Sequence, residues 1–303
     1  MTDTPPPANA AMDELLTRIT AGIVMAAIAC AAAYYGSWPF RALVAIAAFI
    51  MLVEWCDMHK VARYWALVGG LVLAVVLLGG VQYFYPDAVP SPDDSLDVDD
   101  FLPALTAFAG IAGLGLLFGA ATRRIAAGWG FVYLAVPSFA LLVLSWAFVG
   151  LVFWVMVVTW ATDIFAYFAG RAIGGPKLAP AISPNKTWAG LAGGVIGAGL
   201  AGWGMSALFD LGFPFQWIGA PMAVVAQAGD LYESWVKRRA GVKDSGTLLP
   251  GHGGVLDRLD GLMPVALATL LILVAGLWTP PPPDGAAADA DMSVSDDMGN
   301  QSQ

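Results

Sequence analysis

Long apolar segments alternate with short polar connections over most of the chain. A membrane-spanning helix needs roughly 20 apolar residues, and nine segments approach that length. This pattern predicts an all-α, polytopic integral membrane protein with eight to nine transmembrane helices. The predicted segments are residues 19–36, 40–56, 64–85, 101–121, 128–147, 149–169, 188–209, 215–233 and 262–279.

The fifth and sixth segments form one apolar run that is too long for a single crossing. Pro137 and Gly150 lie within this run, and both residue types disfavour a continuous helix. We therefore expect two spans here, with the break between these residues.

The two ends of the chain differ from the region between them. Residues 1–17 and 280–303 are rich in polar residues and proline, and we expect both to be disordered. Between them, residues 18–158 form a first group of predicted spans. Residues 159–279 form a second group that carries two charged loops, 171–187 and 234–261.

Composition supports a membrane protein. The chain is 58% hydrophobic and 12% charged, and its mean hydropathy is +0.71, which excludes an ordinary soluble globular protein. The net charge of -9 arises largely from acidic residues in 87–100 and in the final segment. It therefore does not indicate a basic ligand, and we expect no nucleic-acid partner. Cys30 and Cys56 fall within spans, where they are expected to pack.

The distribution of cations predicts the orientation of the chain, because cytoplasmic loops collect Lys and Arg. With nine spans and a cytoplasmic N-terminus, only Arg41 lies outside. The two charged loops are then cytoplasmic. The cations on the inner side are Arg18, Lys60, Arg63, Arg123, Arg124, Arg171, Lys177, Lys186, Lys237, Arg238, Arg239, Lys243 and Arg258.

A charged cluster follows the eighth predicted span. If that helix continues, Asp230, Ser234, Lys237 and Arg238 share one face, since they are spaced i, i+4, i+7 and i+8. Carboxylates suit a hard divalent cation, and lysines with a glycine-rich segment suit phosphates. The pattern predicts metal-assisted phosphoryl chemistry. The alternative is a charged, solvated loop between two spans. The cluster continues with Lys243, Asp244, His252, Asp257, Arg258 and Asp260.

Two upstream positions add candidate chemistry. Asp163 lies inside the sixth segment, where an ionisable residue is costly and indicates function. It shares a helical face with Tyr167 and Arg171, so a purely structural pairing with Arg171 through Tyr167 is the alternative. Glu54 ends the second segment, and both a solvated, interfacial carboxylate and a functional one remain open.

The loop after Arg171 carries hydroxyl, amide and lysine donors. These groups suit phosphate or a nucleotide base. The alternative is a polar turn that caps the next helix, since Ser-Pro-Asn is typical of turns. The donors are Ser183, Asn185, Lys186 and Thr187.

The charged cluster resembles the signature of the phosphatidate cytidylyltransferase (CDP-diacylglycerol synthase) family. Two upstream segments, Asp163–Arg171 and Ser183–Trp188, are also similar, so the resemblance covers about the second half of the chain. Gly261 departs from the family, since bacterial members often have Ser there. The matching positions are Ser234, Lys237-Arg238, Lys243-Asp244, Gly246, Pro250, His252-Gly253-Gly254, Asp257-Arg258 and Asp260.

The resemblance implies an Mg²⁺-dependent condensation of CTP with phosphatidate, giving CDP-diacylglycerol and pyrophosphate in phospholipid biosynthesis. The protein would lie in the inner (plasma) membrane, with its active site facing the cytoplasm. A lipid phosphate has a second pKa of about 6, so it needs charge neutralisation rather than a general base.

The resemblance also implies roles for the site residues. Asp230 and Asp257 would be the main metal ligands, with Asp163 and Asp260 in support. The alternative is that these aspartates only pair with cations of the cluster. His252 would donate to the leaving pyrophosphate. The phosphates would be held by Lys237, Arg238, Lys243 and Arg258, and the nucleotide or phosphate would contact Ser183, Asn185, Lys186, Thr187 and Ser234.

Two other functions stay open. A transporter would also carry charged residues in its spans, but it would not turn over CTP. An enzyme of the same fold could use another lipid acceptor, such as an archaeal ether lipid. The sequence leaves a homodimer open as well.

Overall fold

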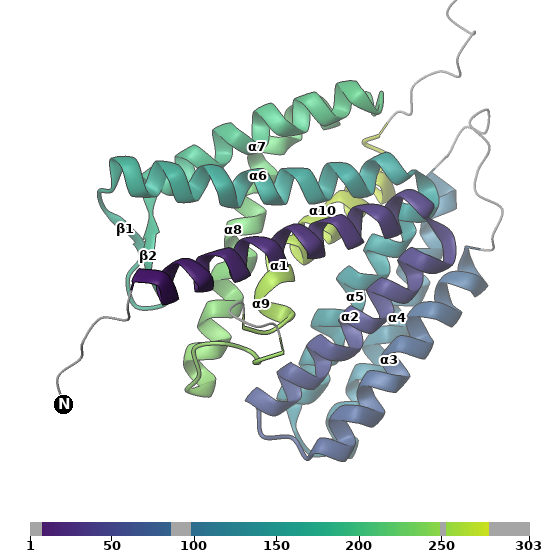
Figure 1. Cartoon of the computed structure of the whole chain (residues 1–303). Coiled ribbons are helices and arrows are strands. Elements are labelled where there is room, and N and C mark those ends of the chain that lie inside the picture. The colour runs from purple at the N-terminus through teal and green to yellow at the C-terminus, as the bar shows by residue number, and fades with distance from the viewer. Residues whose placement is uncertain (1–7, 86–97, 249–252, 279–303) are drawn as a thin grey trace, which may run out of the picture.

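A computed structural model describes residues 8–85, 98–248 and 253–278. Of the ends predicted to be disordered, residues 1–7 and 280–303 lie outside these described residues, as do most of the acidic segment 87–100, Pro250 and His252. Residues 8–17 are helical, so the disorder predicted for them is wrong. Nearly all of the described chain is helical (Figure 1). The helices are α1 (Ala8–Tyr35), α2 (Ser37–Met58), α3 (Arg63–Phe84), α4 (Val98–Thr122), α5 (Ile125–Ala147), α6 (Val149–Ile173), α7 (Trp188–Leu208), α8 (Phe215–Ala240), α9 (Leu256–Leu259) and α10 (Leu262–Val274).

Each of the nine predicted segments coincides with a helix, α9 being the short extra one. Within the described residues, six helices, α2 to α7, are long and apolar enough to cross a membrane. Two further helices contain shorter apolar stretches, Thr20–Tyr35 and Leu262–Val274. The chain is therefore a multi-pass membrane protein, whereas the count of nine spans and the position of the N-terminus stay predictions.

The expected break between the fifth and sixth segments is present and lies between Pro137 and Gly150, as predicted, although Pro137 itself does not interrupt the helix. α5 ends at Ala147 and α6 begins at Val149, and Phe148 between them has an extended backbone. Pro137 lies inside α5 and is buried there. A proline removes one backbone hydrogen bond from a helix, and packing against neighbouring helices tolerates this loss in a membrane protein.

The all-α prediction is corrected by a small β-hairpin between α6 and α7. Strand β1 (Lys177–Ala179) pairs antiparallel with β2 (Ser183–Thr187). Thr187 ends β2, and its Oγ1 accepts a hydrogen bond of 3.0 Å from the Gly190 N–H. The alternative that this segment caps the next helix is therefore confirmed for Thr187.

The helices form two groups. α6, α7 and α8 pack together, and small residues allow α6 and α7 to approach closely: a Cβ at Gly190 or Gly194 would lie 3.0 Å from a backbone oxygen of α6. α2 to α5 form the other group, and α10 packs against members of both. α1 contacts α2 and α6 (Figure 1).

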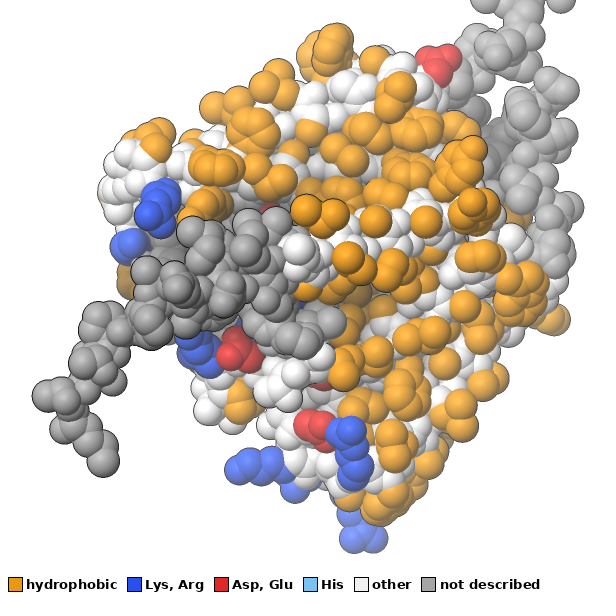
Figure 2. All heavy atoms as spheres, viewed as in Figure 1, with side chains coloured by type: hydrophobic (Ala, Val, Ile, Leu, Met, Phe, Trp, Pro, Cys, Tyr) orange, Lys and Arg blue, Asp and Glu red, His pale blue; other side chains and the backbone are white. Residues whose placement is uncertain are grey.

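The outer surface of the molecule separates apolar and charged side chains. The face in Figure 2 is mainly hydrophobic, and its Lys and Arg side chains gather along the left and lower edges. The β-hairpin and the start of α1 lie at the left end of the same view (Figure 1). The charged loops and the hairpin thus lie toward one end of the helix bundle.

Candidate active site

The candidate site lies where α6, α8, α9 and the β-hairpin meet. A cavity of about 810 Å³ is lined by Asp163, Asp230 and Asp260 from the predicted site. Asp257 and Arg258 line it as well. The fold therefore brings together carboxylates that lie almost 100 residues apart in the sequence.

Asp230 connects helix α8 to the β-hairpin. Its carboxylate forms an ion pair with the Lys186 ammonium, and the Ser234 hydroxyl donates to Asp230 Oδ1 over 3.3 Å. Lys186 Nζ also donates to Gln227 Oε1 over 2.8 Å. Gln227 was not predicted to belong to the site, although its position three residues before Asp230 places it on the same helical face.

Asp260 adds a third carboxylate to the same region. Burial raises the pKa of Asp260, and the negative charges of Asp230 and Asp163 raise this pKa further. The Gly261 N–H opposes this shift by donating to Asp260 Oδ1 over 2.8 Å. Three acids held this close repel one another, so the region favours cations or protonation.

Asp257 belongs to a different hydrogen-bond network. It accepts from Lys237 Nζ over 2.7 Å and from the backbone N–H groups of Ser245 and Gly254 over 3.0 and 2.7 Å. Burial acts to raise the pKa of Asp257, but these donors, Lys237 first, hold the pKa below its usual value. Lys237 also pairs with the fully buried Glu233 over 2.7 Å.

That Asp230 and Asp257 bind the same metal ion therefore stays a prediction. In the structure the two carboxylates have different partners, Lys186 for Asp230 and Lys237 for Asp257. The alternative is that these aspartates only pair with cations of the cluster, and Asp257 does form such a pair, with Lys237. Within the part of the chain that the structure describes, no three His, Cys, Asp or Glu side chains form a group that could hold a metal ion. The present arrangement, with Lys186 on Asp230, does not fit a ready-made Mg²⁺ site, and Mg²⁺ stays a prediction.

The remaining predicted cations are exposed. Lys243 and Arg258 are both exposed, and Arg258 lines the larger cavity. Arg238 is also exposed, and its guanidinium donates to the carbonyls of Ile182 and Val242 over 3.4 and 3.3 Å. Arg238 thereby links the end of α8 to the turn of the hairpin.

A second cavity, of about 610 Å³, lies on the hairpin side of the carboxylates. Its polar lining includes Asn185, Lys186, Thr187 and Arg171, and it shares Asp163, Tyr167 and Asp230 with the larger cavity. Arg171 lies 3.5 Å from the Tyr167 hydroxyl, to which it donates. Ser183 is not among the lining residues, whereas the other three predicted donors of the loop are.

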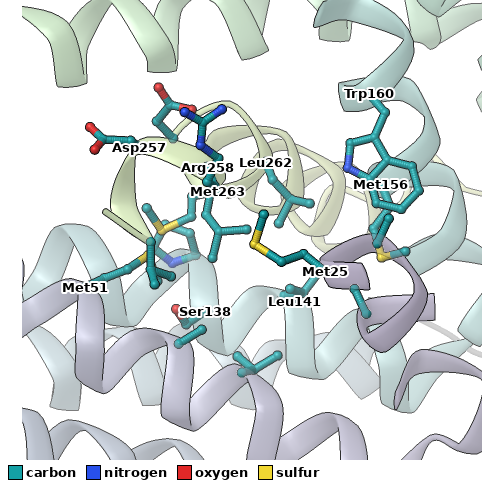
Figure 3. Close-up of a pocket in the computed structure, with 18 of the residues that line it drawn as sticks. Met25, Met51, Ser138, Leu141, Met156, Trp160, Asp257, Arg258, Leu262 and Met263 are labelled. Carbon is teal, nitrogen blue, oxygen red and sulfur yellow. The ribbon is translucent and has the colours of Figure 1, made fainter. Parts of the chain in front are cut away.

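The larger cavity is apolar away from the charged residues. Met25, Met51 and Leu141 lie along it, and Asp257 and Arg258 lie at one end (Figure 3). Its apolar lining comes from α1, α2, α5, α6 and α10. This one cavity therefore extends from the apolar space between the helices to the charged centre.

Fold and site together define a class: a multi-pass α-helical membrane protein whose charged centre joins an apolar and a polar cavity. The chain belongs to the cytidylyltransferase family, whose model matches residues 16–275.

Curated relatives agree with this family. A phosphatidate cytidylyltransferase of Brucella abortus is 49% identical over 166 residues, which cover 51% of this chain and 59% of the relative. Proteins of the same name from Rickettsia bellii and Mycobacterium tuberculosis are 41% identical over 130 residues and 43% identical over 128 residues. These two alignments cover 40% and 41% of this chain, and 55% and 38% of the relatives. The matches thus span less than two thirds of these relatives.

Proposed function

We propose that the protein is a phosphatidate cytidylyltransferase, which joins CTP to phosphatidate and releases pyrophosphate. The observation that carries this proposal is that an apolar cavity and a polar cavity meet at the same pair of aspartates, Asp163 and Asp230. A reaction between a lipid and a nucleotide needs an apolar site for the lipid and a polar site for the nucleotide, and the two sites must meet where the reacting phosphates come together. The names of the relatives support the choice of substrates.

The larger cavity suits the lipid. Its apolar lining, with Met25, Phe40 and Met156, can hold acyl chains, and Lys237 and Arg258 also line it. A phosphatidate placed there would have its phosphate beside cations and its chains among apolar residues, as in a bilayer. The charged end would face the membrane surface.

The smaller cavity suits the nucleotide. Asn185 offers an amide, and Lys186 and Arg171 offer positive charge. These donors can neutralise a triphosphate and contact a base. Lys186 also reaches Asp230, so it lies at the boundary between the two cavities.

The reaction requires one bond to form and one to break. An oxygen of the lipid phosphate attacks the α-phosphorus of CTP, and the bond from that phosphorus to the bridging β-oxygen breaks, so that pyrophosphate leaves with the electron pair. The lipid phosphate is largely dianionic at neutral pH, given a second pKa of about 6, and needs no base. The role of Lys186, Lys237 and Arg258 is to offset the negative charge that accumulates as the two phosphates approach.

The location follows from charge. On the face shown in Figure 2, the Lys and Arg side chains gather along the left edge, where the hairpin lies, and along the lower edge, and cations favour the cytoplasmic side. We place the active site at the cytoplasmic face of the inner (plasma) membrane. A homodimer stays open.

The decisive experiment is an assay of the purified protein in detergent with CTP and phosphatidate, with and without Mg²⁺. Formation of CDP-diacylglycerol and pyrophosphate in equal amounts supports the proposal. No CTP turnover with any lipid phosphate would refute it and favour a transporter. Faster turnover of an ether-linked phosphatidate would identify another lipid acceptor.

The assignment of the cavities has its own test. Met25→Trp should fill the apolar cavity and raise the KM for phosphatidate while leaving the KM for CTP nearly unchanged. Asn185→Ala should do the reverse. If both variants raise the same KM, the two cavities do not serve different substrates.

A further inference from the structure

Glu54 is a buried carboxylate of α2 that contacts the loop before Asp257. The residue is 6% exposed. Its Oε1 accepts from the Val255 N–H over 2.9 Å, and its Oε2 accepts from the Leu256 N–H over 2.9 Å and from the Ser245 hydroxyl over 3.3 Å. The interfacial, solvated alternative for Glu54 is therefore wrong.

This arrangement suits a carboxylate better than any other side chain. Val255 and Leu256 lie at the start of α9, where backbone N–H groups have no partner within the helix. A buried carboxylate is costly unless it is hydrogen-bonded, and here each group satisfies the other. An amide at position 54 could accept through only one of its two terminal atoms.

Two glycines of the loop make room for Glu54. A Cβ at Gly246 would lie 2.7 Å from Glu54 Oε1, and a Cβ at Gly254 would lie 2.6 Å from Glu54 Oε2. Neither glycine has a positive φ, so space rather than backbone conformation requires them. The carboxylate from α2 thus explains why position 246 lacks a side chain, and together with the Ser245 hydroxyl, which lies nearer still, it explains position 254.

The same loop is held from its other side by Asp257, which accepts from the N–H groups of Ser245 and Gly254. Between them, Glu54 and Asp257 satisfy four backbone N–H groups of Ser245, Gly254, Val255 and Leu256. We propose that Glu54 is a positioning residue: by fixing this loop, it places Asp257 and Arg258 at the charged centre. Its effect on catalysis rests on the proposed function.

The primary test is Glu54→Gln in the full-length protein in detergent. The substitution keeps the shape but leaves one loop donor facing an NH₂ group, so amide hydrogen exchange in the peptide Gly253–Leu259 should accelerate by about ten-fold or more. Turnover of CTP should fall about ten-fold, with the KM for CTP and for phosphatidate changing far less, because a misplaced loop affects the transition state most.

Asp57→Asn is the matched control. It removes the same charge from the same helix, but Asp57 pairs with Arg63 at the exposed end of α2. Exchange in the loop and turnover should both stay at the wild-type level. If Asp57→Asn has the same effect as Glu54→Gln, a general effect of charge on α2 replaces the proposal.

Gly246→Ala perturbs the contact from the loop side and serves where Glu54→Gln does not fold. It should accelerate exchange in the same peptide, and the double variant should be little worse than the worse single variant, since both act on one contact. Unchanged exchange in Glu54→Gln and in Gly246→Ala would overturn the proposal. Because exchange is measured without substrate, this result is separate from the absence of CTP turnover, which would overturn only the proposed function.

Discussion

Lys237 offers the sharpest test of the energetics of the site. Its ammonium lies 2.7 Å from Glu233 and 2.7 Å from Asp257, and the side-chain exposures of the three residues are 11%, 0% and 7%. Lys237→Met keeps the apolar stem and removes the charge, which leaves two buried carboxylates without their cation. Removal of one partner from a buried ion pair costs about 3–5 kcal/mol, a large share of a total stability of about 5–15 kcal/mol.

The control for this change is Arg63→Met. Arg63 pairs with Asp57, but the two side chains are 61% and 47% exposed, and a surface pair contributes only about 0–1 kcal/mol. The two variants should therefore differ in unfolding free energy by at least about 2 kcal/mol, which is the gap between these two ranges.

The assay is thermal unfolding in detergent, followed by tryptophan fluorescence at neutral pH. Lys237→Met should unfold at a clearly lower temperature than wild type and Arg63→Met. The double variant Lys237→Met/Glu233→Gln should regain part of the loss, because it removes one of the uncompensated charges. Equal unfolding temperatures for Lys237→Met and Arg63→Met, or a double variant no better than Lys237→Met, would refute the reasoning.

Three further predictions concern the nucleotide, the metal and the topology. Lys186→Ala should raise the KM for CTP more than it lowers kcat, as measured by steady-state kinetics; an unchanged KM would assign Lys186 to holding Asp230 alone. If Mg²⁺ is the cofactor, chelation should abolish turnover, and Asp230→Asn should raise the Mg²⁺ concentration needed for half-maximal rate. Asp257→Asn should instead lower the unfolding temperature, because it disrupts the contacts with Lys237 and the loop; a larger Mg²⁺ effect in Asp257→Asn than in Asp230→Asn would contradict this division. A reporter fused after Trp278 should be extracytoplasmic and one inserted near Lys243 cytoplasmic, and a cytoplasmic C-terminal reporter would mean an even number of spans.

The sequence by itself determined the helices and much of the charged centre. Each apolar segment near the length of a span became a helix, because apolar length and backbone hydrogen bonding act locally. Helical periodicity placed Asp230 and Ser234 on one face, and the hydrogen bond between them confirms it. Lys186 and Asp163 stood out because donors in a short loop and an acid inside a span are unusual.

Only the tertiary structure decided which charged groups became partners. Asp257 lies next to Lys237 rather than in the network of Asp230, although the spacing of these residues permits either arrangement. Glu54 contacts a loop 201 residues away, and no local pattern carries that information. The break at Phe148 lies between Pro137 and Gly150, as the sequence predicted. That Pro137 itself leaves α5 continuous was decided by packing, because contacts between helices compensate a missing backbone hydrogen bond and the sequence of one helix does not specify what packs against it.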